Sequence, residues 1–94
     1  MTSYVYFTSS LPSPIAEELI RAGYRVLEAL AVSEVFHLFE YEDATLCIID
    51  ASIDKARANE IASRFPTLQL EPDATPKDVV SELWLLSQDP ASIP

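Results

Sequence analysis

The sequence predicts a small α/β domain in which a four-stranded parallel sheet is covered by helices on both faces. Short runs of β-branched, aromatic and aliphatic residues alternate with segments of helical periodicity along the 94-residue chain. Such alternation is typical of parallel sheets, and right-handed crossovers narrow the topology to a three-layer, doubly wound, flavodoxin-like fold. The length fits one domain, which we expect to span residues 1–88, followed by a flexible C-terminal tail over residues 89–94.

The first two predicted strands flank a helix with clear start and stop signals. Tyr4–Thr8 is β-branched and aromatic, which predicts a strand buried on both faces. Ser13 followed by Pro14 is the pattern of a helix cap and a first helical residue, and Gly23 favours the end of that helix. Tyr24–Ala29 alternates only partly, as expected of a strand nearer the edge of the sheet. The inward side of the helix is expected to hold Ile15, Leu19 and Ala22.

The next unit contains the most apolar strand. Ser33 is expected to cap a second helix. The run Ala44–Asp50 predicts a central third strand, because buried parallel strands read as continuous apolar runs. Asp54 is expected to cap the third helix, which Pro66 ends. The inward side of the second helix is expected to hold Val35, Leu38 and Phe39.

The last unit is a short strand followed by an apolar helix. Thr67–Leu70 predicts the fourth strand, and Thr75–Asp78 has the spacing of a capping box with proline at the first helical position. The helix that follows is expected to bury Val79, Val80, Leu83 and Leu86.

The charge of the chain argues against several classes of partner. It carries 15 acidic and 6 basic residues, for a net charge of −9. Such a surface repels phosphate backbones and anionic lipids, so we expect no binding to nucleic acid or to membranes. Cys47, the single cysteine, lies in the most apolar run. We expect it to be a buried small hydrophobic residue in a cytoplasmic protein, since it has no disulfide partner.

No residue pattern indicates a cofactor, a metal or an enzyme. One glycine in the whole chain leaves neither a dinucleotide fingerprint nor a phosphate-binding loop. His37 has no second histidine or cysteine at metal-ligand spacing, so we expect a packed or surface histidine. Ser9 and Ser10 follow the first strand without the nucleophile elbow of a hydrolase.

Asp50 is the most informative single residue, because it closes the apolar third strand. Open α/β sheets place their chemistry at the carboxyl ends of the strands. The chemistry of this carboxylate therefore depends on which side chains accompany it.

Three stretches of the chain resemble the receiver domain of bacterial response regulators. Residues 16–29 are similar to the first helix, Gly-Tyr turn and second strand of that family, and Leu46–Asp50 resembles the strand that ends in the phosphoacceptor aspartate. Residues 70–80 resemble the last strand, its Lys-Pro turn and the last helix. The resemblance implies a truncated receiver-like fold with Asp50 at the phosphoacceptor position.

The chain departs from the family at the positions that neutralise phosphate charge. The family's acidic pair, which holds magnesium, corresponds to the hydroxyl-bearing stretch Thr8–Ser10, and its conserved lysine corresponds to Glu71. The chain is also shorter by about one strand–helix unit. Phosphoryl transfer depends on neutralising charge on the transferred group, and loss of one stabilising group costs about 10²–10³ in rate. We therefore expect Asp50, with the degenerate pocket of Thr8, Ser9 and Glu71, to cap its loop and to hold no metal.

The expected function is that of a pseudo-receiver: a phosphorylation-independent protein-interaction module of bacterial signalling, and not an enzyme. Two alternatives stay open. One is a working phosphoacceptor that uses Asp50 with an atypical metal site. The other is a small-ligand binder at the carboxyl ends of the strands, near Thr8, Ser9, Asp50 and Glu71.

The last helix is too apolar for a single inward stripe, because Trp84 and Leu85 follow Leu83 directly. The resemblance points in the same direction, since the last helix of receivers often forms dimer or effector surfaces. Two alternatives stay open: either Trp84 folds back over the core, or part of this helix faces a partner. In the second case we expect docking near Val79, Leu83 and Trp84 with a protein partner, and a homodimer is one form that this contact can take.

Overall fold

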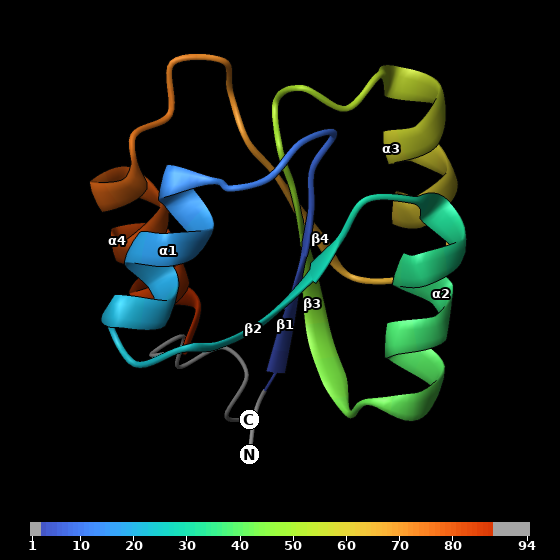
Figure 1. Ribbon diagram of the computed structural model, residues 1–94, viewed down its shortest axis with the longest axis horizontal. Coiled ribbons are helices and arrows are strands. Elements are labelled where there is room, and N and C mark those ends of the chain that lie inside the picture. The colour runs from blue at the N-terminus through green and yellow to red at the C-terminus, as the bar shows by residue number, and fades with distance from the viewer. Residues whose placement is uncertain (1–2, 88–94) are drawn as a thin grey trace.

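The fold is an α/β sandwich of three layers with a parallel sheet in the middle (Figure 1). The computed structural model describes residues 3–87. The four strands are parallel and lie in the order β2-β1-β3-β4, which confirms the predicted flavodoxin-like class. The elements are β1 (Ser3–Phe7), α1 (Pro14–Arg21), β2 (Arg25–Ala29), α2 (Val32–Tyr41), β3 (Ala44–Ile49), α3 (Lys55–Ala62), β4 (Thr67–Gln69) and α4 (Pro76–Ser87).

Each face of the sheet has its own hydrophobic core because side chains alternate along the strands. From β1, Val5 and Phe7 face α2 and α3, whereas Tyr4 and Tyr6 face α1 and α4. All five residues of β1 are buried, which confirms the predicted burial on both faces. The first core also contains Ala29, Val35, Cys47, Ile49, Ile53, Ala58 and Ile61, and the second Ala16, Leu19, Ile48, Val79 and Leu83.

The predicted caps define three of the four helix starts. The Ser13 side chain accepts a hydrogen bond from the Ala16 N–H, and Asp54 accepts one from the Arg57 N–H. Thr75 and Asp78 form the reciprocal bonds of a capping box, at 3.1 and 3.2 Å. These bonds satisfy N–H groups that have no partner within the helix.

Gly23 ends α1 in the left-handed region, with φ of 100°. Its N–H donates to the Ile20 carbonyl, and the Tyr24 N–H then donates to the Leu19 carbonyl. The positive φ explains why the only glycine of the chain stands at this position.

The expected cap of the second helix is wrong. α2 begins at Val32, its cap residue is Ala31, and no side chain caps it, so Ser33 lies inside the first turn. The Glu34 carboxylate instead accepts a 2.8 Å bond from the Leu30 N–H. The first turn of α2 therefore has no side-chain cap, and the Glu34 carboxylate bonds to a backbone N–H that precedes the helix.

Two residues expected on inward helix faces are exposed. Ala22 is the cap residue at the end of α1 and is exposed, and Leu86 is 48% exposed near the end of α4. Leu19, Val79 and Leu83 are buried as expected. The ends of both helices therefore extend past the core that their middle turns cover.

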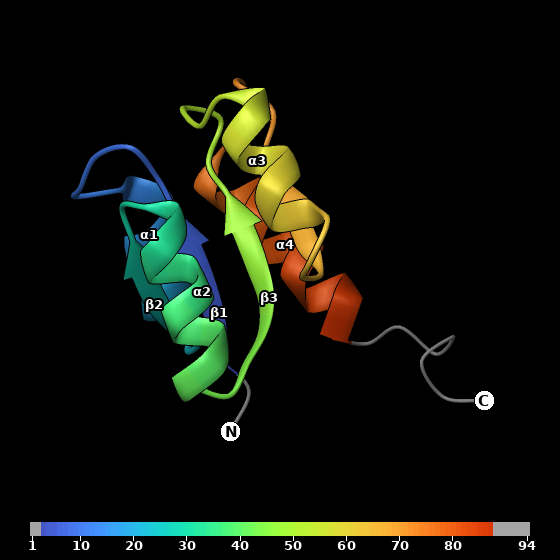
Figure 2. The same cartoon turned by 90° about the vertical axis from the view of Figure 1, so that its right-hand side faces the viewer.

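The two outer strands differ in their surroundings. β2 forms one edge of the sheet, as predicted (Figure 2), and the short β4 forms the other. Within residues 3–87 no helix is long and apolar enough to cross a lipid bilayer. The predicted tail over residues 89–94 lies outside the described residues.

Candidate functional site

Asp50 lies immediately beyond β3, at the carboxyl end of the two central strands. Its N–H donates to the Phe7 carbonyl at 2.9 Å, so the residue still pairs with the end of β1. Ile48 pairs with Tyr6 in the sheet. Because side chains alternate, Asp50 shares the face of Ile48 and Tyr6, which is the face that α1 and α4 cover.

Both carboxylate oxygens of Asp50 are hydrogen-bonded. The Tyr6 hydroxyl donates to Oδ1 at 2.5 Å, and the Ser52 N–H donates to Oδ2 at 3.0 Å. The Ser52 and Thr8 hydroxyls also bond to this carboxylate. The arrangement closes the turn after β3, in which the Ile53 N–H donates to the Asp50 carbonyl, and it confirms the expected capping of the loop.

The hydrogen bonds determine the protonation states of this cluster. Partial burial acts to raise the pKa of the Asp50 carboxyl, but bonds from Ser52, Tyr6 and Thr8 outweigh it and hold the pKa below its usual range. Burial, and then the bond to Asp50, raise the pKa of the Tyr6 hydroxyl well above its usual value. Asp50 is therefore ionised and Tyr6 protonated at neutral pH.

The structure brings Thr8 and Ser9 to Asp50 but not Glu71. Thr8 is 3% exposed, and its hydroxyl lies beside the Ser10 backbone. The Ser9 N–H donates to the Ser52 hydroxyl at 3.2 Å. Glu71 lines a separate depression beside β4 to which neither Asp50, Thr8 nor Ser9 contributes. The expected four-residue pocket is thus divided between two places.

The sequence reasoning did not identify Tyr6, Ser13 or Ser52 as members of this cluster. Ser13 caps α1 and acts to lower the pKa of Tyr6, against the larger effect of burial. The hydrogen bond between Tyr6 and Asp50 joins β1 to the end of β3. Tyr6 could have been identified from the sequence, because a tyrosine hydroxyl in a strand buried on both faces needs a polar partner.

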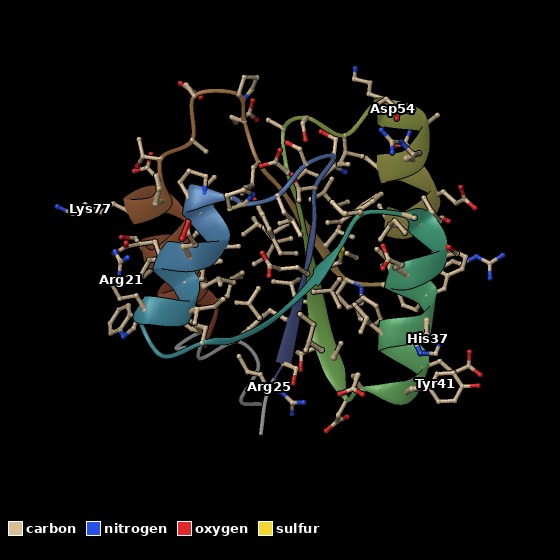
Figure 3. All side chains as sticks on the ribbon, viewed as in Figure 1. Arg21, Arg25, His37, Tyr41, Asp54 and Lys77 are labelled. Carbon is tan, nitrogen blue, oxygen red and sulfur yellow. The ribbon has the colours of Figure 1, made fainter. Side chains whose placement is uncertain are left out.

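The groups that hold Asp50 are hydroxyls and a backbone N–H, with no lysine or arginine among them. Arg57 pairs with Asp54 at the start of α3, and Arg25 pairs with Glu42 at 3.2 Å. Arg21 and Lys77 extend outward from the layer of α1 and α4 (Figure 3). Residues 3–87 contain no cluster of three or more His, Cys, Asp or Glu side chains suited to a metal ion.

His37 lies on the surface of the domain, and Cys47 lies in its core. His37 is exposed on α2, and its ring centroid lies 4.6 Å from that of Tyr41 (Figure 3). Cys47 is fully buried, and burial raises the pKa of its thiol to about 12. A thiol of this kind is unreactive at neutral pH.

The residues that we expected near a partner lie on different sides of α4. Val79 is 2% exposed and Leu83 is fully buried, so both pack in the core beneath the helix and not on its outward side. A partner contact at these two residues stays a prediction. Trp84 is 55% exposed, and the structure adds Leu85 and Leu86 at 58% and 48%. We call Trp84, Leu85 and Leu86 the α4 apolar surface.

Comparison of the chain with protein-family models, with curated proteins and with solved structures finds no match. The fold and the geometry of these sites are therefore the basis for any functional conclusion.

Proposed function

We propose that this chain is a protein-interaction module that docks through the α4 apolar surface and does not transfer phosphoryl groups. The observation that carries the proposal is the exposure of three consecutive large apolar side chains, Trp84, Leu85 and Leu86. Single exposed apolar residues are ordinary, whereas contiguous ones mark interaction surfaces.

Helix geometry places these residues on the outward side of α4. Successive residues are about 100° apart around the axis, and Leu83 faces the core. Leu85 therefore points away from the core and Trp84 and Leu86 flank it on either side, so the three side chains spread over the outward half of the helix. No charged residue interrupts the stretch from Leu83 to Ser87.

The partner that best suits this uncharged surface is a second copy of the chain. An isologous contact places each residue near its own equivalent or a close neighbour. Most of an acidic surface would repel its own copy, but the uncharged stretch 83–87 can meet its equivalent without opposing like charges. Ile20, at the same end of the parallel helix α1, is 49% exposed and extends the apolar character of this end.

The receiver resemblance supports the same class of function. A parallel sheet in the order 2-1-3-4 with an aspartate at the carboxyl end of β3 fits a shortened receiver. The free, buried Cys47 fits a cytoplasmic location. In this proposal the domain acts in bacterial signalling by its shape, and Asp50 maintains that shape.

Light scattering after size-exclusion chromatography tests the proposed dimer. We expect the wild-type chain to elute as a dimer at high micromolar concentration, and the double variant Trp84→Gln/Leu85→Gln as a monomer. The matched control is Leu30→Gln/Tyr41→Gln, which changes two residues that are 46% and 66% exposed elsewhere, and which should stay dimeric. A monomeric wild-type chain, or equal behaviour of the two double variants, contradicts the proposal.

Incubation with acetyl phosphate and magnesium tests the absence of phosphoryl transfer. Both oxygens of Asp50 accept hydrogen bonds, and no lysine or arginine is among the groups that bond to it. We therefore expect no phosphoryl adduct by intact-mass spectrometry after an incubation that fully modifies a working receiver. An adduct that disappears in Asp50→Asn would establish the phosphoacceptor alternative instead.

A further inference from the structure

The outer edge of β4 and the depression beside it form a second candidate surface, separate from the α4 apolar surface. β4 pairs with β3 only and ends the described sheet. The depression, of about 220 Å³, lies between β4 and α4. Its lining residues are Leu68, Gln69, Leu70, Glu71, Asp73, Ala74, Asp78, Val79 and Glu82.

The backbone of β4 presents unpaired groups toward this edge. The Pro66 carbonyl accepts from the Cys47 N–H, and the Leu70 N–H donates to the Ile49 carbonyl. Alternate residues of a strand bond to the same neighbour, so Leu68 also faces β3. The N–H and C=O groups of Thr67 and Gln69 then point to the outer side, where an added strand would pair with them.

The depression combines an apolar floor with an acidic rim. Leu68, Leu70 and Ala74 are half-buried and Val79 is buried, whereas all four acids of the lining are exposed. The lining contains no lysine or arginine. The three ion pairs of residues 3–87 use other acids, namely Glu18, Glu42 and Asp54. The rim therefore has negative charge that is not neutralised within the described part of the chain.

We propose that this edge binds an extended, arginine- or lysine-rich segment of another protein, which adds to the sheet as a fifth strand beside β4. Its backbone would pair with Thr67 and Gln69, as in other cases of strand addition. The aliphatic stems of its basic side chains would lie on the apolar floor, with their charged ends at the rim of Glu71, Asp73, Asp78 and Glu82.

Charge argues against two other occupants of this edge, namely a second copy of the chain and residues 88–94 of the same chain. A second copy that paired edge to edge would bring these acids against their own equivalents. Residues 88–94 contain an aspartate, two prolines and no basic residue, so their charge does not complement the rim. A basic partner of different sequence fits both the charge and the strand edge.

Fluorescence anisotropy tests the proposed strand addition, with a labelled seven-residue peptide of alternating arginine and threonine as the probe. We expect saturable binding to the wild-type chain, and binding about three- to tenfold weaker in Glu71→Gln/Glu82→Gln, as the loss of two exposed charge pairs implies. The matched control, Glu17→Gln/Glu40→Gln, removes the same charge from two exposed acids elsewhere and should bind within twofold of the wild type. A peptide with proline in place of threonine keeps the charge but lacks strand-forming N–H groups, and should bind more weakly.

Amide NMR spectra of the complex locate the contact, and we expect the largest shifts at Thr67 and Gln69. Absence of saturable binding at millimolar peptide, equal effects of the two double variants, or equal binding of the proline peptide would overturn the proposal. The variant Trp84→Gln/Leu85→Gln should retain peptide binding. This inference therefore succeeds or fails independently of the proposed dimer.

Discussion

Replacing Leu83 by alanine is expected to lower the free energy of unfolding by about 3 kcal/mol, with a decrease in Tm on the order of 15 °C. Leu83 is fully buried and packs in the core that α1 and α4 share with one face of the sheet. Alanine leaves a cavity between helix and sheet that rigid neighbours cannot fill. Urea unfolding, followed by circular dichroism, measures the loss.

Leu85→Ala is the matched control, because it removes the same atoms two residues further along the same helix. Leu85 is 58% exposed, so we expect a loss of less than about 0.5 kcal/mol in the monomer. Both variants are compared at a concentration at which the chain is monomeric, so that association does not contribute. Equal losses in the two variants would contradict the assignment of Leu83 to the core and Leu85 to the surface.

Tyr6→Phe is expected to lower the free energy of unfolding by about 2 kcal/mol at pH 7, because a hydrogen bond to a charged group contributes about 1.5–3 kcal/mol. Phenylalanine keeps the ring in the core, but the Asp50 carboxylate then loses the donor at 2.5 Å.

The effect of Tyr6→Phe should depend on pH in a defined direction. The pKa of Asp50 in the folded protein lies below that of an unperturbed aspartate, which is about 3.9. The stability that its ionised form contributes is therefore fully present above the unperturbed value and is lost as pH falls through the lower folded-state value. We expect the difference between wild type and Tyr6→Phe to decrease from pH 7 to pH 3, toward the roughly 1 kcal/mol of a bond between neutral groups.

Urea unfolding at both pH values checks this expectation, with Tyr41→Phe as the control. Tyr41 is 66% exposed, so its hydroxyl should contribute little at either pH. A loss for Tyr6→Phe that is the same at pH 7 and pH 3 would mean that the Asp50 charge does not strengthen the bond.

Helix caps were largely predictable from the sequence, because a cap depends on hydrogen bonds to the backbone of its own turn. Ser13, Asp54 and the Thr75–Asp78 box cap their helices as predicted, because each satisfies N–H groups within its own turn. The prediction for Ser33 failed because α2 begins one residue earlier, at Val32, so that Ser33 lies inside the first turn. The caps that were predicted correctly lie directly before their helices, whereas a helix that starts without a side-chain cap leaves no such signal in the sequence.

The candidate site was only partly predictable, because its members come from separate segments. The position of Asp50 followed from the apolar strand before it, and its capping role is confirmed. Tyr6 lies 44 residues away in sequence, and only the register between β1 and β3 brings its hydroxyl to the carboxylate. Glu71 was misplaced for the complementary reason: it follows β4, on the far side of β3 from Thr8.

The position of β1 has a consequence for how this chain reaches its native state. β1 pairs with both β2 and β3 and contributes side chains to both cores. During synthesis β1 emerges before both of its neighbours, and the second of them begins only at Ala44. A fragment of the domain that stops before that residue lacks one of the two neighbours of its central strand, so we expect the domain to fold cooperatively only after β3 has left the ribosome.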